Sequence, residues 1–398
     1  MDDFGLSVLL GIKMRAFREE NARKPASQLL NAARKVFGGD AARVLEQLHL
    51  TEKASQKTPT LAARDWLFST KSYEQCTAES VARFKASLLQ VKNQPFTDLT
   101  AGAGVDAWFV GAEASRLQLV EADEQHAAYL SANFTDRPHR LWVGTAEEVL
   151  PQLEAGGLAY LDPDRRPVGR RVYDFSDARP DVLLLLPQLR QKFNSIWLKA
   201  SPMLDVTACL NQLTPHCRAV YALCLGDELK ELLFELQPMA VEDAVILEAV
   251  QLMSDGRVFR TAVAKSDAQP VLPQIQIASG DFLFEPHAGI IKLRLGRHLA
   301  AQHGLSAIGA ADFYVGKAEV ADFPGRQFRI RAVLPYKPKQ LVAWLRENGI
   351  QKAHVSKRDF FLETEAIRKA LKLPMGEDAR LFFTKNQQGE AICVVCER

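Results

Sequence analysis

Phe96-Thr-Asp-Leu-Thr-Ala-Gly-Ala-Gly-Val-Asp106 is the most informative stretch of this chain, and Leu119-Val-Glu-Ala-Asp123 follows it closely. Together they predict a buried strand, a tight glycine turn, the start of a helix and a second strand that ends in a carboxylate. This order is typical of a doubly wound sheet, which binds ligands at the carboxyl edge of its strands. Gly102 and Gly104 allow the backbone to approach a ligand where a Cβ would clash.

The ligand class follows from the charges around this turn. The spacing Gly102-x-Gly104-x-x-Ala107, with an acid further on, also fits the dinucleotide fingerprint. Asp98, however, would repel a pyrophosphate and attract the ammonium of a methionine. We therefore expect S-adenosylmethionine (SAM), with NAD or FAD and an ordinary turn without ligand as the open alternatives.

The rest of the chain predicts several domains. Residues 1–92 carry apolar residues at helical spacing. From Phe96 onward, short strands alternate with helices, which predicts a parallel sheet. The expected strands are 96–101, 117–122, 139–144, 157–162, 195–200 and 218–223. The expected helices are 106–112, 123–133, 145–153, 182–193, 203–213 and 227–234.

Two later β-rich runs, 244–252 and 258–264, flank Ser254-Asp255-Gly256. Asp-Gly between two apolar runs predicts a hairpin. A parallel sheet that ends in an antiparallel strand is the arrangement of the class I methyltransferases. Residues 268–270 are the expected domain boundary, and a small α+β region follows them.

The charge of the chain is unevenly distributed. Residues 326–398 hold 15 Lys and Arg against 8 Asp and Glu, a net charge of +7, so the remaining residues carry −5 of the total of +2. A basic module beside a mildly acidic body suits a phosphate-rich substrate such as RNA. A solvated basic face without a ligand is the alternative.

Several motifs, taken together, resemble the bacterial class I SAM-dependent methyltransferases that carry a THUMP-like C-terminal domain. The motifs lie in order along the chain: Tyr73-Glu-Gln-Cys-Thr-Ala-Glu-Ser80, Asp98-Leu-Thr-Ala-Gly-Ala-Gly-Val-Asp106, Val120-Glu121, Asp162-Pro-Asp-Arg-Arg166 and Phe284-Glu-Pro-His-Ala-Gly-Ile-Ile-Lys292. The resemblance implies a Rossmann-like α/β fold with a seven-stranded sheet whose last strand is antiparallel. It implies four regions: helices in 1–92, the methyltransferase domain in 93–268, a ferredoxin-like domain in 269–329 and a THUMP-like domain in 330–398. Because true THUMP domains bind RNA, it also implies an RNA methyltransferase.

The predicted cofactor site is built from strand ends. Glu121 would accept hydrogen bonds from both ribose hydroxyls, and Asp98 would bind the methionine ammonium. Asp106 is expected either to cap the following helix or to contact ligand, whereas Asp123 is expected to cap the helix that follows it rather than to contact ligand. Glu147 would lie against the adenine or serve as a first-turn acid of its helix. The full predicted set is Asp98, Thr100, Gly102, Gly104, Asp106, Glu121, Ala122, Ala146, Glu147 and Asp162.

Asp162 and Pro163 are the predicted catalytic residues. In amino-methylating enzymes of the wider class, Asp or Asn followed by prolines and an aromatic residue positions the target nitrogen. Here Asp164-Arg165-Arg166 replaces the second proline and the aromatic residue, which leaves the target atom open. The basic loop that follows is expected either to bind substrate or to form surface ion pairs. Its candidate substrate-binding residues are Arg165, Arg166, Arg170, Arg171 and Tyr173.

Methyl transfer from a sulfonium depends mainly on positioning, so no nucleophile is expected. Cys76 is interpreted as part of a lid. Cys393-Val-Val-Cys396 is a single Cys-x-x-Cys motif, whereas a zinc site needs four ligands. In a strand its two thiols would also face opposite sides, so no metal site is expected. The scattered cysteines and the absence of a signal-peptide pattern predict a cytoplasmic protein that has no membrane partner. The competing functions are a small-molecule or protein methyltransferase and a non-catalytic SAM- and RNA-binding protein.

Overall fold

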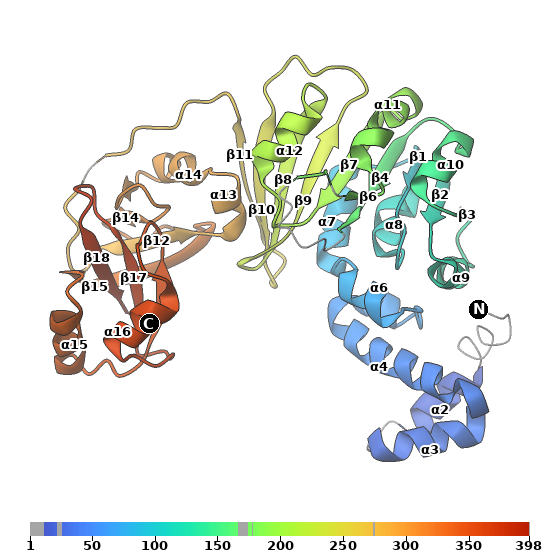
Figure 1. The fold of residues 1–398 in the computed structure, drawn as a ribbon, viewed down its shortest axis with the longest axis horizontal. Helices are drawn as coiled ribbons and strands as arrows, with labels where there is room; N and C mark the ends of the chain where they lie inside the picture. Colours follow the sequence, from blue (N-terminus) through green and yellow to red (C-terminus); the bar gives the residue numbers. More distant parts are fainter. Residues whose placement is uncertain (1–11, 22–25, 166–173, 177, 274, 398) are drawn as a thin grey trace. The chain divides into compact units, whose positions relative to one another are not determined.

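The computed structural model describes residues 12–21, 26–165, 174–176, 178–273 and 275–397 (Figure 1). The chain forms two compact units. One comprises Met1–Arg218 and Leu232–Asp243, and the other comprises Ala219–Glu231 and Ala244–Arg398. Among the described residues, no helix combines the length and the apolar composition needed to cross a bilayer.

The first unit begins with helices, as predicted for residues 1–92. In α4, residues Val44, Gln47, Leu50 and Ala54 are buried, and this spacing of three to four positions presents one face of the helix to its neighbours. Ser69 begins α6 with a capping box, in which its hydroxyl accepts from the Ser72 N–H. The helices are α2 (Ile12–Asn21), α3 (Ala26–Phe37), α4 (Ala41–Lys57), α5 (Pro59–Ala62), α6 (Thr70–Gln75) and α7 (Glu79–Leu89).

The main sheet has the order β11-β10-β8-β9-β7-β4-β1-β2-β3 (Figure 1). Strands β3, β2, β1, β4 and β7 are parallel to one another, and β9 runs antiparallel to β7. The strands are β1 (Pro95–Asp98), β2 (Arg116–Glu121), β3 (Arg140–Val143), β4 (Leu158–Leu161), β7 (Ser195–Ala200), β8 (Cys217–Leu225), β9 (Glu228–Leu236), β10 (Ile246–Leu252) and β11 (Val258–Ala264). The α helices between these strands are α8 (Val105–Val110), α9 (Glu124–Asn133), α10 (Ala146–Val149), α11 (Val182–Lys192) and α12 (Val206–Leu213).

One predicted helix is wrong. Residues 227–234 were expected to be helical because their leucines and glutamates also fit a helical period, but residues 228–234 lie in strand β9. Gly226 has a φ of +58° and turns the chain after β8, so the following residues pair in the sheet. Residues 231–236 are all buried, which is typical of a strand covered on both faces. Tertiary pairing therefore overrides the local helical pattern.

The predicted hairpin is confirmed, with Ile246 opposite Ala264 and Leu252 opposite Val258. It extends the sheet beyond β8, because β10 pairs with β8 in parallel. The main sheet therefore has nine strands where seven were expected, and the antiparallel strand that precedes the hairpin is β9. The expected α/β class is otherwise confirmed.

A second sheet of seven strands has the order β13-β14-β12-β15-β18-β17-β16. Its strands are β12 (Phe282–Pro286), β13 (Ser306–Ala307), β14 (Tyr314–Gly316), β15 (Gly325–Pro335), β16 (Ala353–Lys357), β17 (Ala379–Lys385) and β18 (Ala391–Cys396). The helices of this region are α13 (Ala288–Lys292), α14 (Gly296–Gln302), α15 (Pro338–Glu347) and α16 (Thr364–Leu371). Strand β15 pairs with β12 through its first half and with β18 through its second. The expected boundary between residues 329 and 330 falls inside this strand, and the division into ferredoxin-like and THUMP-like domains stays a prediction.

The two cysteines of β18 face opposite sides of the second sheet, as predicted. Cys393 packs with Leu341 and Phe383 in one core, whereas Cys396 packs with Leu283 and Phe382 in another. All six cysteines are free thiols. Burial raises the pKa of Cys393 and that of Cys396, because a thiolate is poorly solvated in an apolar core.

Gly157 sets the approach of β4 to β1, and its replacement gives a test of the main sheet. Gly157 has a φ of +71°, and a Cβ there would overlap the carbonyl oxygen of Pro95 and lie 2.7 Å from the carbonyl carbon. Gly156 also has a positive φ, of +97°, but a Cβ there would meet nothing within 4 Å. We expect Gly156→Ala to cost about 1 kcal/mol from backbone strain alone. Gly157→Ala should cost about 3 kcal/mol more, because it also overpacks a backbone contact. Equal decreases in the free energy of unfolding, measured by urea titration, would contradict this account.

Candidate functional site

A cavity of about 1230 Å³ opens in the first unit at the carboxyl ends of β1, β2, β4 and β7. Among the described residues, eight carboxylates line it together with the glycine turn, Lys71 and Lys199; they are those of Asp98, Asp106, Glu121, Asp123, Glu147, Asp162, Asp164 and Asp181. The predicted residues that line it are Asp98, Thr100, Gly102, Gly104, Asp106, Glu121, Ala122, Ala146, Glu147 and Asp162. The structure thus brings the whole predicted cofactor set to one cavity.

The glycine turn forms the floor of this cavity. Gly102 and Gly104 have φ values of +52° and +78°, which L side chains rarely adopt. Gly104 begins α8, and a Cβ on it would lie 2.7 Å from Cδ2 of Leu130 and 2.8 Å from Cε2 of Phe134. A Cβ on Gly102 would meet only the Thr100 carbonyl oxygen, at 3.8 Å. Gly104 is therefore required for packing, whereas Gly102 is required for the turn itself.

Glu121 is held at the end of β2 by two backbone donors. The N–H of Gly102 donates to Oε2 and the N–H of Asp123 donates to Oε1, each at 2.8 Å. Asp123 itself caps α9, since its carboxylate accepts from the N–H of His126 at 2.9 Å, as predicted. Each Glu121 oxygen has a further lone pair, so the carboxylate is oriented to accept hydrogen bonds from a ligand in the cavity.

Asp98 is almost completely buried, with 1% of its surface exposed. One carboxylate oxygen accepts from the Thr100 N–H at 3.0 Å. Burial is the main cause that raises the pKa of Asp98 to about 8. The Thr100 N–H opposes this rise, whereas three nearby carboxylates, those of Asp106, Asp162 and Glu121, add to it. A cationic group in the cavity would relieve this crowding, so the site fits a ligand that carries an ammonium.

Asp106 belongs to a buried polar network under the cavity. Its Oδ1 lies 2.7 Å from Nζ of Lys85, whose side chain is 0% exposed. Its Oδ2 accepts from the hydroxyls of Thr77 and Tyr160, each at 2.9 Å. Burial acts to raise the pKa of Asp106, but the charges of Lys85 and Lys199, together with the hydrogen bonds from Lys85 and Thr77, lower this pKa on balance. Gly104 rather than Asp106 is the N-cap of α8, so the capping role considered for Asp106 is wrong. Its ligand role stays a prediction.

Asp162 follows β4 and lies beside Lys199 of β7. The parallel register pairs Leu161 with Leu198, so the next residue of each strand also lies side by side. Nζ of Lys199 is 2.5 Å from Oδ2 of Asp162, and both residues line the cavity. The Asp162 N–H donates to the Thr100 hydroxyl at 2.6 Å, which ties the end of β4 to the glycine turn. Pro163 is half-buried and does not belong to the described cavity lining.

The third strand is followed by a capping box in which Thr145 and Glu148 bond reciprocally. Glu147 lies in the first turn of α10, and its Oε1 accepts from the Asp181 N–H at 2.9 Å. Ala146 is buried beside it. Glu147 is thus both a first-turn acid and a cavity residue, and its contact with adenine stays a prediction.

The rim of the cavity is formed by α6 and a short hairpin. The described lining includes Ser69, Lys71 and Cys76 around α6, and the lid role of Cys76 stays a prediction. Lys71 lies 3.5 Å from Asp164 in β5 (Asp164–Arg165), which pairs with β6 (Ala178–Arg179). The backbone of Arg165 lies in β5. The other predicted substrate residues, Arg166, Arg170, Arg171 and Tyr173, lie outside the described residues.

Lys85, Lys199 and His126 are among the polar residues of the site that sequence analysis missed, and two of these three carry a recognisable signal. Lys85 falls on the buried stripe of α7, between Val81 and Leu89. Lys199 interrupts the apolar strand Ser195–Ala200. His126, whose Nε2 lies 2.7 Å from the Ser69 hydroxyl, has no comparable signal because it occupies an ordinary helix position.

The network around Lys85 generates a stability prediction. Lys85→Met would leave the Asp106 carboxylate buried without its cation, which typically costs about 3–5 kcal/mol. The double variant Lys85→Met/Asp106→Asn should recover a large part of this stability because no unpaired charge remains. Lys92→Met is the control, since Lys92 and Glu113 form a pair in which both side chains are exposed, and such pairs contribute about 0.2–1 kcal/mol. Urea titration measures the free energies, and a double variant as unstable as Lys85→Met would refute the charge argument.

Comparison with known proteins agrees with this architecture. Residues 325–398 match the family model described as THUMP domain-like. Two curated relatives from two strains of Mycobacterium tuberculosis, each named "uncharacterized S-adenosylmethionine-dependent methyltransferase", are 23% identical over 346 residues, which is 85% of this chain and 90% of the relative. The crystal structure of a "putative methyltransferase" from Porphyromonas gingivalis W83 covers 100% of this chain and 99% of its own, with a TM-score of 0.84 and 22% identity. The chain thus shares the fold of that structure and carries a THUMP-like domain at residues 325–398, and both findings agree with the resemblance found in the sequence.

Proposed function

We propose that this protein is a SAM-dependent methyltransferase that methylates a base nitrogen of RNA in the cytoplasm. The observation that carries the proposal is the cavity itself, where Asp98, the glycine turn and Glu121 meet at the carboxyl edge of a class I methyltransferase sheet. The names of the Mycobacterium tuberculosis relatives agree with this activity and cofactor.

The residues fit SAM by the chemistry of their polar groups. Asp98 would bind the ammonium, Glu121 the ribose hydroxyls, and the amides of the glycine turn would lie beneath the methionine arm. A pyrophosphate, by contrast, would meet the buried Asp98 and three further carboxylates, which disfavours a dinucleotide. SAM supplies a methyl group already activated by its sulfonium, so the protein's task is to position the acceptor.

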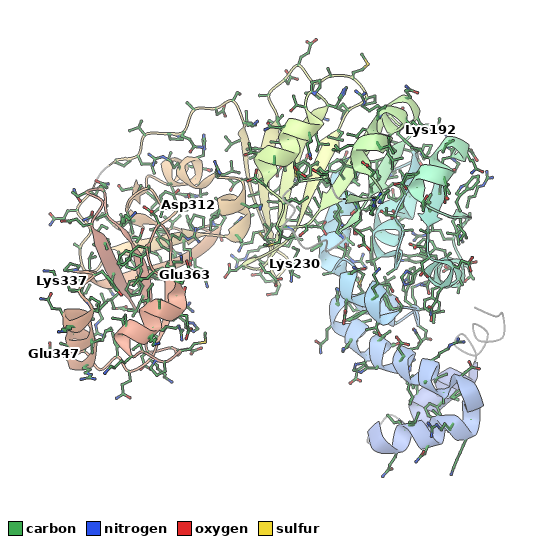
Figure 2. All side chains as sticks on the ribbon, viewed as in Figure 1. Lys192, Lys230, Asp312, Lys337, Glu347 and Glu363 are labelled. Carbon is green, nitrogen blue, oxygen red and sulfur yellow. The ribbon has the colours of Figure 1, made fainter. Side chains whose placement is uncertain are left out.

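RNA as the substrate is supported by charge and by the C-terminal domain. Residues 326–398 carry a net charge of +7. In this region Lys337 precedes α15 and Glu347 ends it (Figure 2). Lys337, Lys339 and Arg346 are exposed on or beside this helix. True THUMP domains bind RNA, and we extend this property to the THUMP-like domain. Arg166, Arg170, Arg171 and Tyr173 stay candidates for contact with the target nucleotide.

The state of Asp98 predicts that SAM-site ligands bind with release of a proton. At pH 7 a carboxyl with a pKa of about 8 is mostly protonated, but it must ionise to pair with the ligand ammonium. Affinity for S-adenosylhomocysteine should therefore rise between pH 6 and pH 8, by at most about tenfold per unit. Calorimetry in two buffers with different ionisation enthalpies should detect the released proton.

Asp98→Asn should bind S-adenosylhomocysteine weakly and without this pH dependence. The control Asp136→Asn changes an exposed carboxylate outside the cavity lining and should behave as the wild type. Equal binding heats in both buffers for the wild type would contradict the assignment of Asp98, and tight binding of NADH without heat from S-adenosylhomocysteine would end the SAM proposal.

Transfer of a labelled methyl group from SAM tests the function as a whole. The probe is a pool of unmodified bacterial ribosomal and transfer RNAs transcribed in vitro. Glu121→Ala should bind S-adenosylhomocysteine at least about tenfold more weakly and transfer methyl proportionately more slowly, because the ribose acceptor is gone. Glu124→Ala, an exposed acid three residues further on, is the matched control.

The RNA contribution is tested on the whole chain. Deletion of residues 326–398 would remove most of β15, the partner of β12, and would damage the second sheet. We instead expect Lys337→Glu/Lys339→Glu/Arg346→Glu to weaken RNA binding and to flatten its dependence on salt, by about 0.7–0.9 in logarithmic slope for each phosphate that the protein no longer neutralises. Lys53→Glu/Lys92→Glu in the other unit is the control. An unchanged affinity of the triple variant for RNA would remove the support for RNA as substrate. In the transfer assay, labelling of protein or small molecules in place of RNA would favour a protein or small-molecule methyltransferase.

A further inference from the structure

The ion pair between Lys199 and Asp162 changes the chemistry expected at the transfer position. Asp162 is the residue that the Asp-Pro motif places after β4, and Lys199 reaches it from the adjacent strand at 2.5 Å. The side chains of Lys199 and Asp162 are 12% and 37% exposed, respectively, and both line the cavity. The lysine charge also acts on Asp106 and on Cys76, which places it centrally among the cavity groups.

Charge compensation at Asp162 disfavours an amine as methyl acceptor. When an exocyclic amine attacks a sulfonium, positive charge moves from sulfur to nitrogen. An unpaired carboxylate stabilises the positive charge on nitrogen. A carboxylate and an ammonium together have no net charge, so the pair stabilises a positive charge much less. The same argument applies to the N1 atom of adenine, which becomes cationic when it is methylated.

A lactam nitrogen has the opposite requirement. The N–H of guanine N1 or uracil N3 must lose its proton, and the negative charge that develops is shared with the adjacent carbonyl oxygen. A carboxylate can take this proton, and a nearby ammonium stabilises the charge on the oxygen. Lys199 and Asp162 place these two groups side by side at the strand ends.

We infer that Lys199 is a catalytic residue and that the acceptor is a lactam ring nitrogen of an RNA base, of the guanine N1 or uracil N3 type. This inference rests on the proposed function and narrows its target atom. The carbon–sulfur bond of SAM breaks as the bond between the ring nitrogen and the methyl carbon forms. The electron pair of the broken bond stays on sulfur in S-adenosylhomocysteine, and the N–H proton passes to the Asp162 carboxylate and then to solvent.

The first readout is the identity of the methylated nucleoside. After transfer of labelled methyl to the unmodified ribosomal and transfer RNA pool, digestion and chromatography should place the label in 1-methylguanosine or 3-methyluridine. Label in N2-methylguanosine, 1-methyladenosine or N6-methyladenosine would overturn the inference while leaving the proposed function intact. An absence of label in any RNA nucleoside, with S-adenosylhomocysteine still bound, would instead count against the proposed function.

The second readout is the behaviour of Lys199→Met. We expect transfer to fall about 10²–10³-fold, the usual effect of removing one stabilising donor. Affinity for S-adenosylhomocysteine should change little. The rate of methyl transfer by Lys199→Met should continue to rise at alkaline pH, where that of the wild type has levelled. The reason is that the lactam N–H of the RNA base must then ionise without the Lys199 ammonium beside it. Lys199→Arg should recover part of the rate.

Lys92→Met is the matched control, since Lys92 is an exposed lysine outside the cavity lining. Thermal melting checks that each variant is folded. An unshifted pH profile in a folded Lys199→Met, or an equally slow rate in Lys199→Arg and Lys199→Met, would show that Lys199 only supports the structure.

Discussion

Several carboxylates meet at one cavity, and the need to compensate their charges shapes the structure around it. Lys85 offsets Asp106 from beneath, at 2.7 Å, and Lys199 contacts Asp162 from the next strand. Two backbone N–H groups hold Glu121 in place of a cation. Asp98 is compensated least, and burial among the other carboxylates raises its pKa to about 8. The charges of the cavity residues alone therefore favour a cationic ligand.

The helical region at residues 12–92 takes part in this cavity. Trp66 donates from Nε1 to the carbonyl of Ala103 in the glycine turn at 2.8 Å. The backbone of Leu67 exchanges two hydrogen bonds with the side chain of Asn133 in α9, at 2.8 and 3.0 Å. Lys85 comes from α7 of the same region. These contacts explain why the helices and the sheet belong to one compact unit. The helices supply both the cover of the cavity and the cation beneath it.

The C-terminal half presents a different physical problem. Its second sheet joins strands that were expected to belong to two domains, because β15 is long enough to pair with β12 and then with β18. Apolar cores lie on both faces of this sheet. The basic charge of residues 326–398 therefore belongs to the surface of one continuous sheet and its helices. The predicted domain boundary between residues 329 and 330 separates strands that hydrogen-bond to each other.

The sequence by itself determined the strand–turn–helix pattern, the capping role of Asp123 and the ten predicted cofactor-site residues that line the cavity. Each of these depends on local features: glycines where φ is positive, alternation of strands and helices, and acids at strand ends. Tertiary structure alone decided that residues 228–236 form a strand, because their leucines suit either period and only pairing within the sheet selects one. It also decided the partners of Asp106 and Asp162. Lys85 and Lys199 lie 21 and 37 residues away in sequence, so only the packing of α7 and the register of β4 with β7 bring their charges to the site.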